Sequence, residues 1–556
     1  MKIVKMTSCI CLLTLGFTSM ADNTTGIHLY ESGMYSASKV YFLKKLNTIS
    51  SPEEKAEACY YLGESYLMLG KQDSARLYFE KGVEVLPADP YNQIGLGVFL
   101  LKEDVKKAEA LFKEILSGRL YKKDVNVYVA VARAYMQAGN VTKAREYIEQ
   151  AKKVDRKSGL PFLLEGDLLR AQRQLGEAAT TYDHAIHFSP ELIGAYVKNA
   201  RIYMSSNSNR AVSLERLNAV KEFAPDFTGV DCVIGELYEA QGDSKNAVQH
   251  YARFIESGYY DVEHLLRYAG ILHFDKQYDK MLPIILPVLQ KTPDNLVAKR
   301  LYAYALAKIE PGKKSLEAIQ HFIETTPREN HITQDYLCYA DQLVANEQIA
   351  AAIPYYGKIV QKDTTKKAMW ATIGDLFIKI GSRDSADHYL ALYESTLPAP
   401  DLQLLFKRGR NLYILGARDS VPERRTVVLQ KADTVFARLS ELAPKFAPAY
   451  IWRARIYSQL DPETLQGLAK PYYEKMMEIV LESGNSERYK AELIECCKYL
   501  GYYYYVQADA ITEKHNGNPD FAKAEYLKAK EYFSKVLEYS PNDQGAIDAL
   551  QGITIQ

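Results

Sequence analysis

The sequence predicts an all-α fold, an α-solenoid built from stacked helix pairs. Two observations predict it. A small residue is followed twelve positions later by Ala, and four positions after that by a large apolar residue, as in Gly63, Ala75 and Phe79. This pattern returns with a period of about 34 residues. Further copies are Gly166, Ala178 and Tyr182; Gly235, Ala247 and Tyr251; Gly374, Ala386 and Leu390. Such repeats bury their apolar faces only against neighbouring repeats.

Each residue type in the pattern has a packing reason. The small residue lies in the first helix of a pair, where only a short side chain fits against the second helix. The large residue lies one turn after the Ala on the same helix face. Pro87 then ends the repeat, because proline lacks a backbone N–H and clashes with the preceding turn. Tyr60, Gly63, Ala75, Phe79 and Pro87 together resemble the tetratricopeptide repeat family, which implies a right-handed superhelix.

The spacing predicts about thirteen repeats, which cover nearly all of the chain. An incomplete repeat precedes them, with Ala37 and Tyr41 in its second helix, and a terminal capping helix follows over 542–556. The predicted first helices start near Glu57, Tyr91, Val125, Gly159, Ile193, Thr228, Val262, Leu296, Thr333, Lys367, Leu402, Ala447 and Ile494.

Four regions follow from this register. Residues 1–21 form a signal segment, 22–295 an N-terminal repeat arm, 296–332 an irregular repeat, and 333–556 a C-terminal arm. The irregular repeat fits the pattern least well, so a change of superhelix direction is expected there. Two inserted loops are expected in the C-terminal arm, over 417–430 and 510–523. Long loops in regular arrays often carry function, and the alternative interpretation is length variation tolerated at the surface.

The first 21 residues are typical of a secretory signal. Lys2 and Lys5 precede an apolar stretch, and Ser19, Met20 and Ala21 form a small-x-small cleavage site. No Cys directly follows the apolar stretch, which argues against a lipoprotein. We expect an exported protein that begins at Asp22 and is periplasmic or peripherally associated with an outer membrane, without an integral membrane span.

Composition excludes some function classes. Lys plus Arg and Asp plus Glu both number 69, so the net charge is zero and no basic footprint for nucleic acid exists. Five cysteines remain beyond residue 21, and a chain of this length does not need disulfides, so we expect buried free thiols. Metal-protease, thiol-redox and serine-hydrolase motifs are absent. We therefore expect no enzyme activity, no cofactor and no metal.

The resemblance implies that first helices line an inner binding groove. At the groove positions, charges fall in blocks: Arg133, Arg170 and Arg201; Asp341 and Asp375; Arg410 and Arg455. Tyr502 and Tyr505 complete the candidate binding residues. The Lys–Asn carboxylate clamp of chaperone-binding family members is absent, because no first helix has Lys followed by Asn four residues later.

The leading hypothesis is a non-enzymatic scaffold or adaptor of the cell envelope that holds partner polypeptides in this groove. The alternative is a glycan- or nutrient-binding component of an outer-membrane uptake system, since sugar-binding lipoproteins contain such repeats. Only two Trp occur, and Trp is the usual residue for stacking on sugars, so this alternative has less support.

Overall fold

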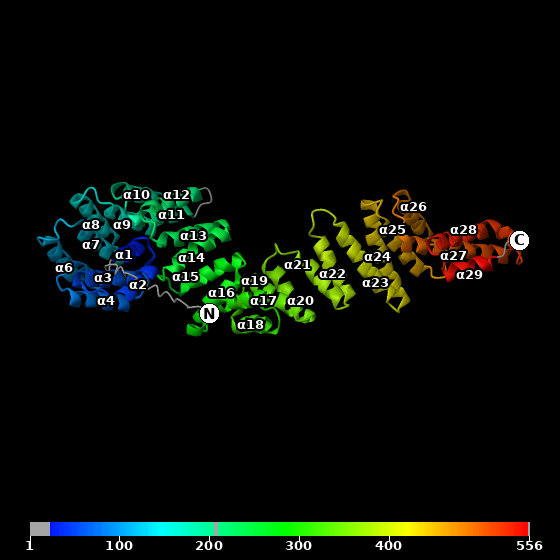
Figure 1. The fold of residues 1–556 in the computed structure, drawn as a ribbon, viewed down its shortest axis with the longest axis horizontal. Coiled ribbons are helices and arrows are strands. Elements are labelled where there is room, and N and C mark those ends of the chain that lie inside the picture. Colours follow the sequence, from blue (N-terminus) through cyan, green and yellow to red (C-terminus); the bar gives the residue numbers. More distant parts are fainter. Residues whose placement is uncertain (1–22, 205–208, 554–556) are drawn as a thin grey trace, which may run out of the picture. The chain divides into compact units, whose positions relative to one another are not determined.

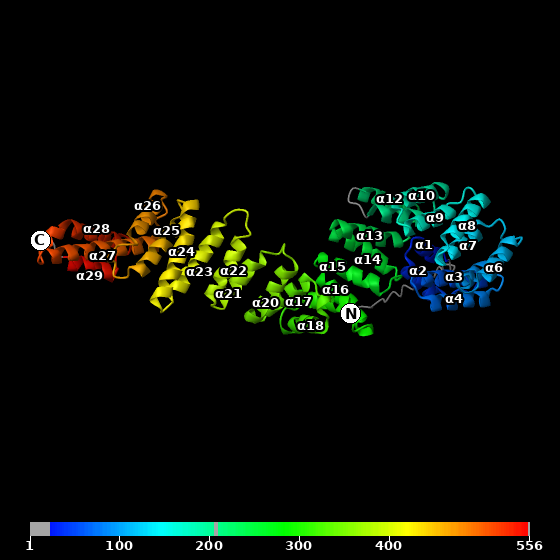
Figure 2. The same cartoon turned by 180° about the vertical axis from the view of Figure 1, so that it is seen from behind.

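A computed structural model describes residues 23–204 and 209–553 (Figures 1 and 2). Within these residues every regular element is a helix, as predicted, and the helices pack in consecutive pairs. The predicted signal segment lies outside the described residues. No helix among those described has the length and apolar character needed to cross a membrane.

The chain divides into two compact units between Ile309 and Glu310, within the segment predicted to be irregular. The helices of unit 1 are α1 (Thr24–Glu31), α2 (Tyr35–Lys45), α3 (Pro52–Met68), α4 (Gln72–Val85), α5 (Pro90–Glu103), α6 (Val105–Ser117), α7 (Val125–Gln137), α8 (Val141–Val154), α9 (Leu160–Ala171), α10 (Leu175–Phe188), α11 (Ile193–Met204), α12 (Arg210–Phe223), α13 (Gly229–Gln241), α14 (Ser244–Glu256), α15 (Val262–Phe274), α16 (Tyr278–Lys291) and α17 (Leu296–Ile309).

Unit 2 continues the series to a short last helix. Its helices are α18 (Lys313–Thr325), α19 (Thr333–Ala345), α20 (Ile349–Lys362), α21 (Met369–Lys379), α22 (Arg383–Glu394), α23 (Leu402–Ala417), α24 (Pro422–Leu442), α25 (Ala447–Leu460), α26 (Lys470–Glu482), α27 (Lys490–Lys514), α28 (Lys523–Tyr539) and α29 (Gln544–Gly552). Helices α3 to α28 correspond in chain order to the first and second helices of the thirteen predicted repeats, with α17 in unit 1 and α18 in unit 2. The incomplete repeat is α1–α2, and α29 has the place of the capping helix.

Close packing explains the small residues of the repeat. A Cβ added to Gly63 would lie 2.4 Å from the ring of Phe79, and one added to Gly95 in the next repeat would lie equally close to the same ring. Phe79 therefore fills the space between two first helices. Gly166 meets Tyr182 in the same way, at 2.4 Å.

The turn inside many of the described pairs contains a residue with positive φ. Glycine supplies it at Gly70 and Gly139, with φ of 72° and 84°. Arg173 and Glu347 take the equivalent place in their repeats, both at φ 62°, which a side chain makes unfavourable. The turn geometry is thus fixed by the repeat rather than by a Gly at each position.

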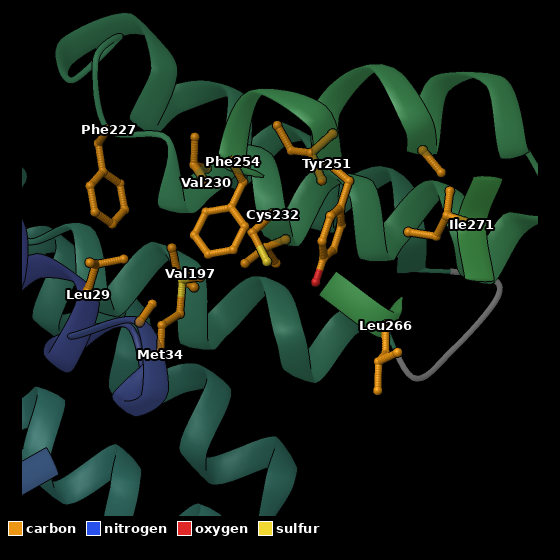
Figure 3. Close-up of a cluster of buried hydrophobic side chains, with 14 of the residues drawn as sticks. Leu29, Met34, Val197, Phe227, Val230, Cys232, Tyr251, Phe254, Leu266 and Ile271 are labelled. Carbon is orange, nitrogen blue, oxygen red and sulfur yellow. The ribbon is translucent and has the colours of Figure 1, made fainter. Parts of the chain in front are cut away.

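The first helix pair makes contacts far along the chain. Leu29 and Met34 lie beside Val197 and Phe227 in one buried cluster that also contains residues of α13 to α17 (Figure 3). Lys44 Nζ donates a hydrogen bond to the Gly258 carbonyl at 2.6 Å. The rings of Tyr41 and Tyr259 lie 4.9 Å apart, and Ser36 bonds to Asp261. Unit 1 therefore closes on itself, because its start packs against its sixth and seventh repeats.

The prediction of two inserted loops in unit 2 is corrected by the structure. Most of 417–430 is helix, since α24 begins at Pro422, and 510–514 belongs to α27. The extra residues lengthen helices because their apolar spacing continues: Leu429 of α24 packs against Gly416 of α23. Only 418–421 and 515–522 remain outside α-helices, the latter including the short helix η3 (Pro519–Ala522).

All five cysteines of the described part of the chain are buried free thiols, as predicted. Burial raises the pKa of Cys59 and of Cys497 to about 11. A thiol with a raised pKa holds its proton at neutral pH and is a weak nucleophile. These cysteines therefore serve the packing of first helices.

Candidate functional site

The inner face of unit 1 is filled by the chain's own first helix. α1 lies inside the curve formed by α3, α7, α9, α11 and α13 (Figure 1). A Cβ on Gly194 of α11 would come within 2.7 Å of the Glu31 carbonyl oxygen, and His28 packs edge-on against Phe227 at 5.8 Å. A partner polypeptide cannot occupy this part of the groove while α1 is in place.

A polar network connects α1 to the helices around it. Tyr30 Oη donates to Glu64 Oε2 at 2.6 Å, and Gln137 Nε2 donates to the same oxygen at 2.8 Å. Arg133 lies over the Tyr30 ring at 5.3 Å, donates to Tyr60 Oη at 3.2 Å, and approaches Glu64 to 3.9 Å. Burial raises the pKa of Glu64 although Arg133 opposes this shift. Arg133 thus holds α1, α3 and α7 together.

A second ion pair, Lys198 with Asp167, lines a cavity together with Glu31 of α1. Lys198 Nζ binds Asp167 Oδ2 at 2.6 Å, and the side chains are 6% and 15% exposed. Burial lowers the pKa of Lys198, while Asp167 acts in the opposite direction. Such a pair is costly to disrupt, since removing one partner leaves the other charge buried.

The three arginines predicted as one basic patch have different surroundings. Arg133 is largely buried in the network, whereas Arg170 and Arg201 are exposed. Arg133 and Arg170 line one cavity of about 90 Å³, and Arg201 lines another of about 270 Å³. Arg201 also pairs with Glu236 at 3.2 Å. Arg133 and Arg170 therefore share one cavity, whereas Arg201 lines another and pairs with Glu236 of the next repeat.

The second predicted basic block lies on the face that α23 and α25 share. Arg410 and Arg455 lie over the ring of Trp452 at 5.3 and 4.8 Å, and Tyr413 meets this ring edge-on at 5.0 Å. Arg455 makes a two-pronged ion pair with Glu495, at 2.9 and 2.6 Å. The structure therefore brings these two predicted residues together through Trp452.

Arg410 belongs to a group of three arginines. Burial and the guanidinium groups of Arg418 and Arg410 lower the pKa of Arg383, whose Nη1 donates to Asn411 Oδ1 at 3.1 Å. Within the described residues, none of these three arginines forms an ion pair. Repulsion between them favours an anionic partner.

The remaining predicted residues are already engaged or lie apart. Asp341 accepts a hydrogen bond from Tyr356 Oη at 2.6 Å, and Asp375 pairs with Lys407 at 3.0 Å. Tyr502 is 45% exposed, whereas Tyr505 packs against Tyr526 at 6.1 Å. The predicted acidic patch therefore consists of two carboxylates that have partners in their own or the next repeat.

Sequence reasoning missed Trp452, Glu495 and the residues of α1. Glu64, Asp167 and Glu236 occupy the same repeat position as the arginines, so comparison of adjacent repeats could have predicted their pairing. Nothing local indicates that Tyr30 reaches Glu64. Among the side chains that the structure describes, no three His, Cys, Asp or Glu are grouped as a metal site.

Comparison with known proteins identifies repeats in three segments. Models described as tetratricopeptide repeat match residues 56–89 and 125–158, and another of the same description matches 234–257. A tetratricopeptide repeat-containing protein of Methanocaldococcus jannaschii is 26% identical over 156 residues. The match covers 28% of this chain and 26% of that relative, so the chain spans about a quarter of the relative's length.

Two solved structures are also similar. One is the C-terminal part of a tetratricopeptide repeat-containing protein of Cytophaga hutchinsonii, at 26% identity, 51% coverage of this chain, 99% of that one and a TM-score of 0.36. The other is a tetratricopeptide repeat protein of Parabacteroides merdae, at 16% identity, 46% and 98% coverage, and a TM-score of 0.30.

Proposed function

We propose that this tetratricopeptide repeat protein is a non-catalytic scaffold that binds an acidic segment of a partner polypeptide on unit 2. Proteins of this repeat family are generally scaffolds for protein–protein interaction. The observation that carries the proposal is the surface formed by Arg383, Arg410, Arg418 and Trp452, which we call the arginine–tryptophan surface. It combines the partly buried Trp452 ring with three arginines that form no ion pair within the described residues.

Two physical terms favour such a partner. Carboxylates relieve the repulsion between the three guanidinium groups and form charge-assisted hydrogen bonds with them. Trp and Arg are also the residue types that dominate binding free energy at protein interfaces. In unit 1 the corresponding groove is occupied by α1, so unit 2 offers the accessible inner face.

We place the interaction in the cell envelope because residues 1–21 have the pattern of a secretory signal. N-terminal sequencing of the native protein tests this location. A chain that starts at Asp22 supports export, whereas an intact Met1 on a protein from the cytosol would overturn it.

Affinity purification of the tagged protein from native envelopes tests the binding surface. Arg410→Glu reverses one cation of the arginine–tryptophan surface, and Lys431→Glu, at an exposed position on the second helix α24, is the matched control. Both variants should melt like the wild type, since exposed charges contribute little to stability. Arg410→Glu should lose partners that Lys431→Glu retains. Identical partner sets for the two variants would contradict the proposed surface.

A further inference from the structure

A cavity of about 200 Å³ lies at the C-terminal end of α1. Its walls come from five helices: Glu31 of α1, Glu57 and the tyrosines of α3, Tyr91 of α5, Arg133 of α7 and Leu160 of α9. Glu57 is exposed, so the cavity opens to solvent on that side, whereas Tyr60 at its floor is 3% exposed. The cavity lies entirely within unit 1 and is separate from the arginine–tryptophan surface.

Three phenol rings form one side of this cavity. The rings of Tyr60 and Tyr61 lie 5.2 Å apart edge-to-face, and those of Tyr60 and Tyr91 lie 5.4 Å apart. Aromatic faces attract cations through their quadrupoles, and groups of such rings recognise ammonium ligands. The rings therefore provide a surface that suits a positively charged ligand with apolar substituents.

The charges around the cavity leave an excess of negative charge. Arg133 is balanced by Glu64, and Lys198 is balanced by Asp167 at 2.6 Å. In the part of the chain that the structure describes, the Glu31 carboxylate forms no hydrogen bond and no ion pair. Burial raises its pKa to about 7, although Arg133 and Lys198 oppose this shift. The C-terminal end of α1 adds partial negative charge at the same point.

We propose that this cavity binds a small organic cation, an ammonium compound with about seven or eight heavy atoms. The ammonium group lies against the tyrosine rings and pairs with Glu31. The size follows from the volume, since a cavity of about 150 Å³ accommodates benzene. The Glu31 carboxylate forms no ion pair within the described part of the protein, so the ammonium group of the ligand would serve as its counter-ion.

Calorimetric titration of the full chain with choline and with ethanolamine tests the proposal. These probes carry a quaternary and a primary ammonium on the same short chain. The control ligand is 3,3-dimethyl-1-butanol, which has the shape of choline without its charge. At least one ammonium should bind with a Kd of about 1 mM or tighter, and the neutral alcohol should bind at least about tenfold more weakly.

Variants of the protein locate the binding. Glu31→Gln and Tyr91→Leu should each weaken ammonium binding about tenfold, whereas Glu80→Gln, an exposed acid on α4, should leave it unchanged. Glu31→Gln removes a charge that is unfavourable when buried, so its melting temperature should equal or exceed that of the wild type. Failure of both ammonium probes to bind overturns the proposal. So does equal binding of the neutral alcohol, or undiminished binding by Glu31→Gln.

Discussion

Units 1 and 2 consist of the same repeat, yet their cores are connected differently. In unit 1 one buried cluster joins Leu29 and Phe42 to residues as distant as Tyr251 and Leu301. In unit 2 one cluster spans α23 to α25 and another spans α25 to α29, so each joins helices that are neighbours in sequence. A solenoid whose start returns to a later repeat acquires non-local contacts, whereas an open one depends on nearest neighbours.

The two units also differ in the kind of ligand that each can bind. The inner face of unit 1 encloses α1, a polar network and small cavities. The arginine–tryptophan surface of unit 2 presents an exposed Arg410 beside Trp452. Closure therefore favours small ligands in unit 1, and the open face favours extended polypeptides in unit 2.

The largest expected effect comes from matched core truncations, Leu29→Ala in unit 1 and Leu429→Ala in unit 2. Both side chains are at most 1% exposed, so each variant should lose about 3–4 kcal/mol of unfolding free energy. Hydrogen exchange distinguishes the units. Leu29→Ala should reduce protection in α1–α3 and also in α11–α15, whereas Leu429→Ala should affect only α23–α25. Purely local loss in both variants would mean that closure contributes nothing to the stability of unit 1.

A slightly smaller effect compares two ion pairs, each broken by replacing Lys with Met. Lys198→Met leaves Asp167 inside unit 1 without its cation and should cost about 3 kcal/mol. Lys407→Met breaks a pair in unit 2 whose side chains are 45% and 44% exposed, and should cost about 0–1 kcal/mol. Urea unfolding of both variants measures the difference. Equal costs would show that solvent screens the Lys198 pair as well.

Local patterns predicted the repeats because each repeat packs mainly against its neighbours. The expected starts at Val125, Val262, Leu296, Thr333 and Leu402 are the first residues of their helices. The return of α1 to α11 and α13 was not predictable in the same way. Leu29 and Val230 lie about two hundred residues apart, and their contact depends on the summed curvature of six repeats rather than on any local pattern.

The candidate site was predictable only in part for the same reason. Repeat position placed Arg410 and Arg455 on one face, and in the structure both lie over the ring of Trp452, which was not predicted. The balance of charge depended on contacts between repeats: Glu495 lies 40 residues after Arg455, and Glu64 lies two repeats before Arg133. The blocks of like charge in the sequence therefore overestimated how many charged side chains of the groove lack an oppositely charged partner.

A moderate effect is expected where α1 approaches α11. Gly194→Ala places a Cβ 2.7 Å from the backbone oxygen of Glu31, which cannot move without displacing α1, so we expect a loss of about 1–3 kcal/mol. The control is Gly270→Ala in α15, which has no atom within 4 Å of the added Cβ and should gain up to about 1 kcal/mol. Thermal melting compares them. A Gly194→Ala protein as stable as the wild type would indicate that α1 is not held against α11.

The smallest expected effect is a pH dependence specific to unit 1. The pKa of Glu31 is raised from 4.5 to about 7, so between these values the folded state binds a proton that the unfolded state has released. The contribution of Glu31 to the free energy of unfolding therefore falls as pH rises through that window. In unit 2 the shifted carboxyl pKa values, those of Asp363, Asp419 and Asp543, are lowered instead, and their contribution falls at acid pH.

A pKa shift of this size corresponds to a loss of about 3 kcal/mol of unfolding free energy at high pH. Solvent that enters the cavity should reduce this loss to about 1–2 kcal/mol. The charged groups that act on Glu31 are Arg133, Lys198 and Asp167, and all three are present in both the wild type and Glu31→Gln. Glu31→Gln should therefore be more stable than the wild type at pH 8 and nearly equal to it at pH 5. Urea unfolding at the two pH values, followed by hydrogen exchange in α1 and α7, measures this difference. If the wild type and Glu31→Gln respond equally to pH, Glu31 is already paired in solution, and the cavity at the end of α1 loses the feature that distinguishes it from the open face of unit 2.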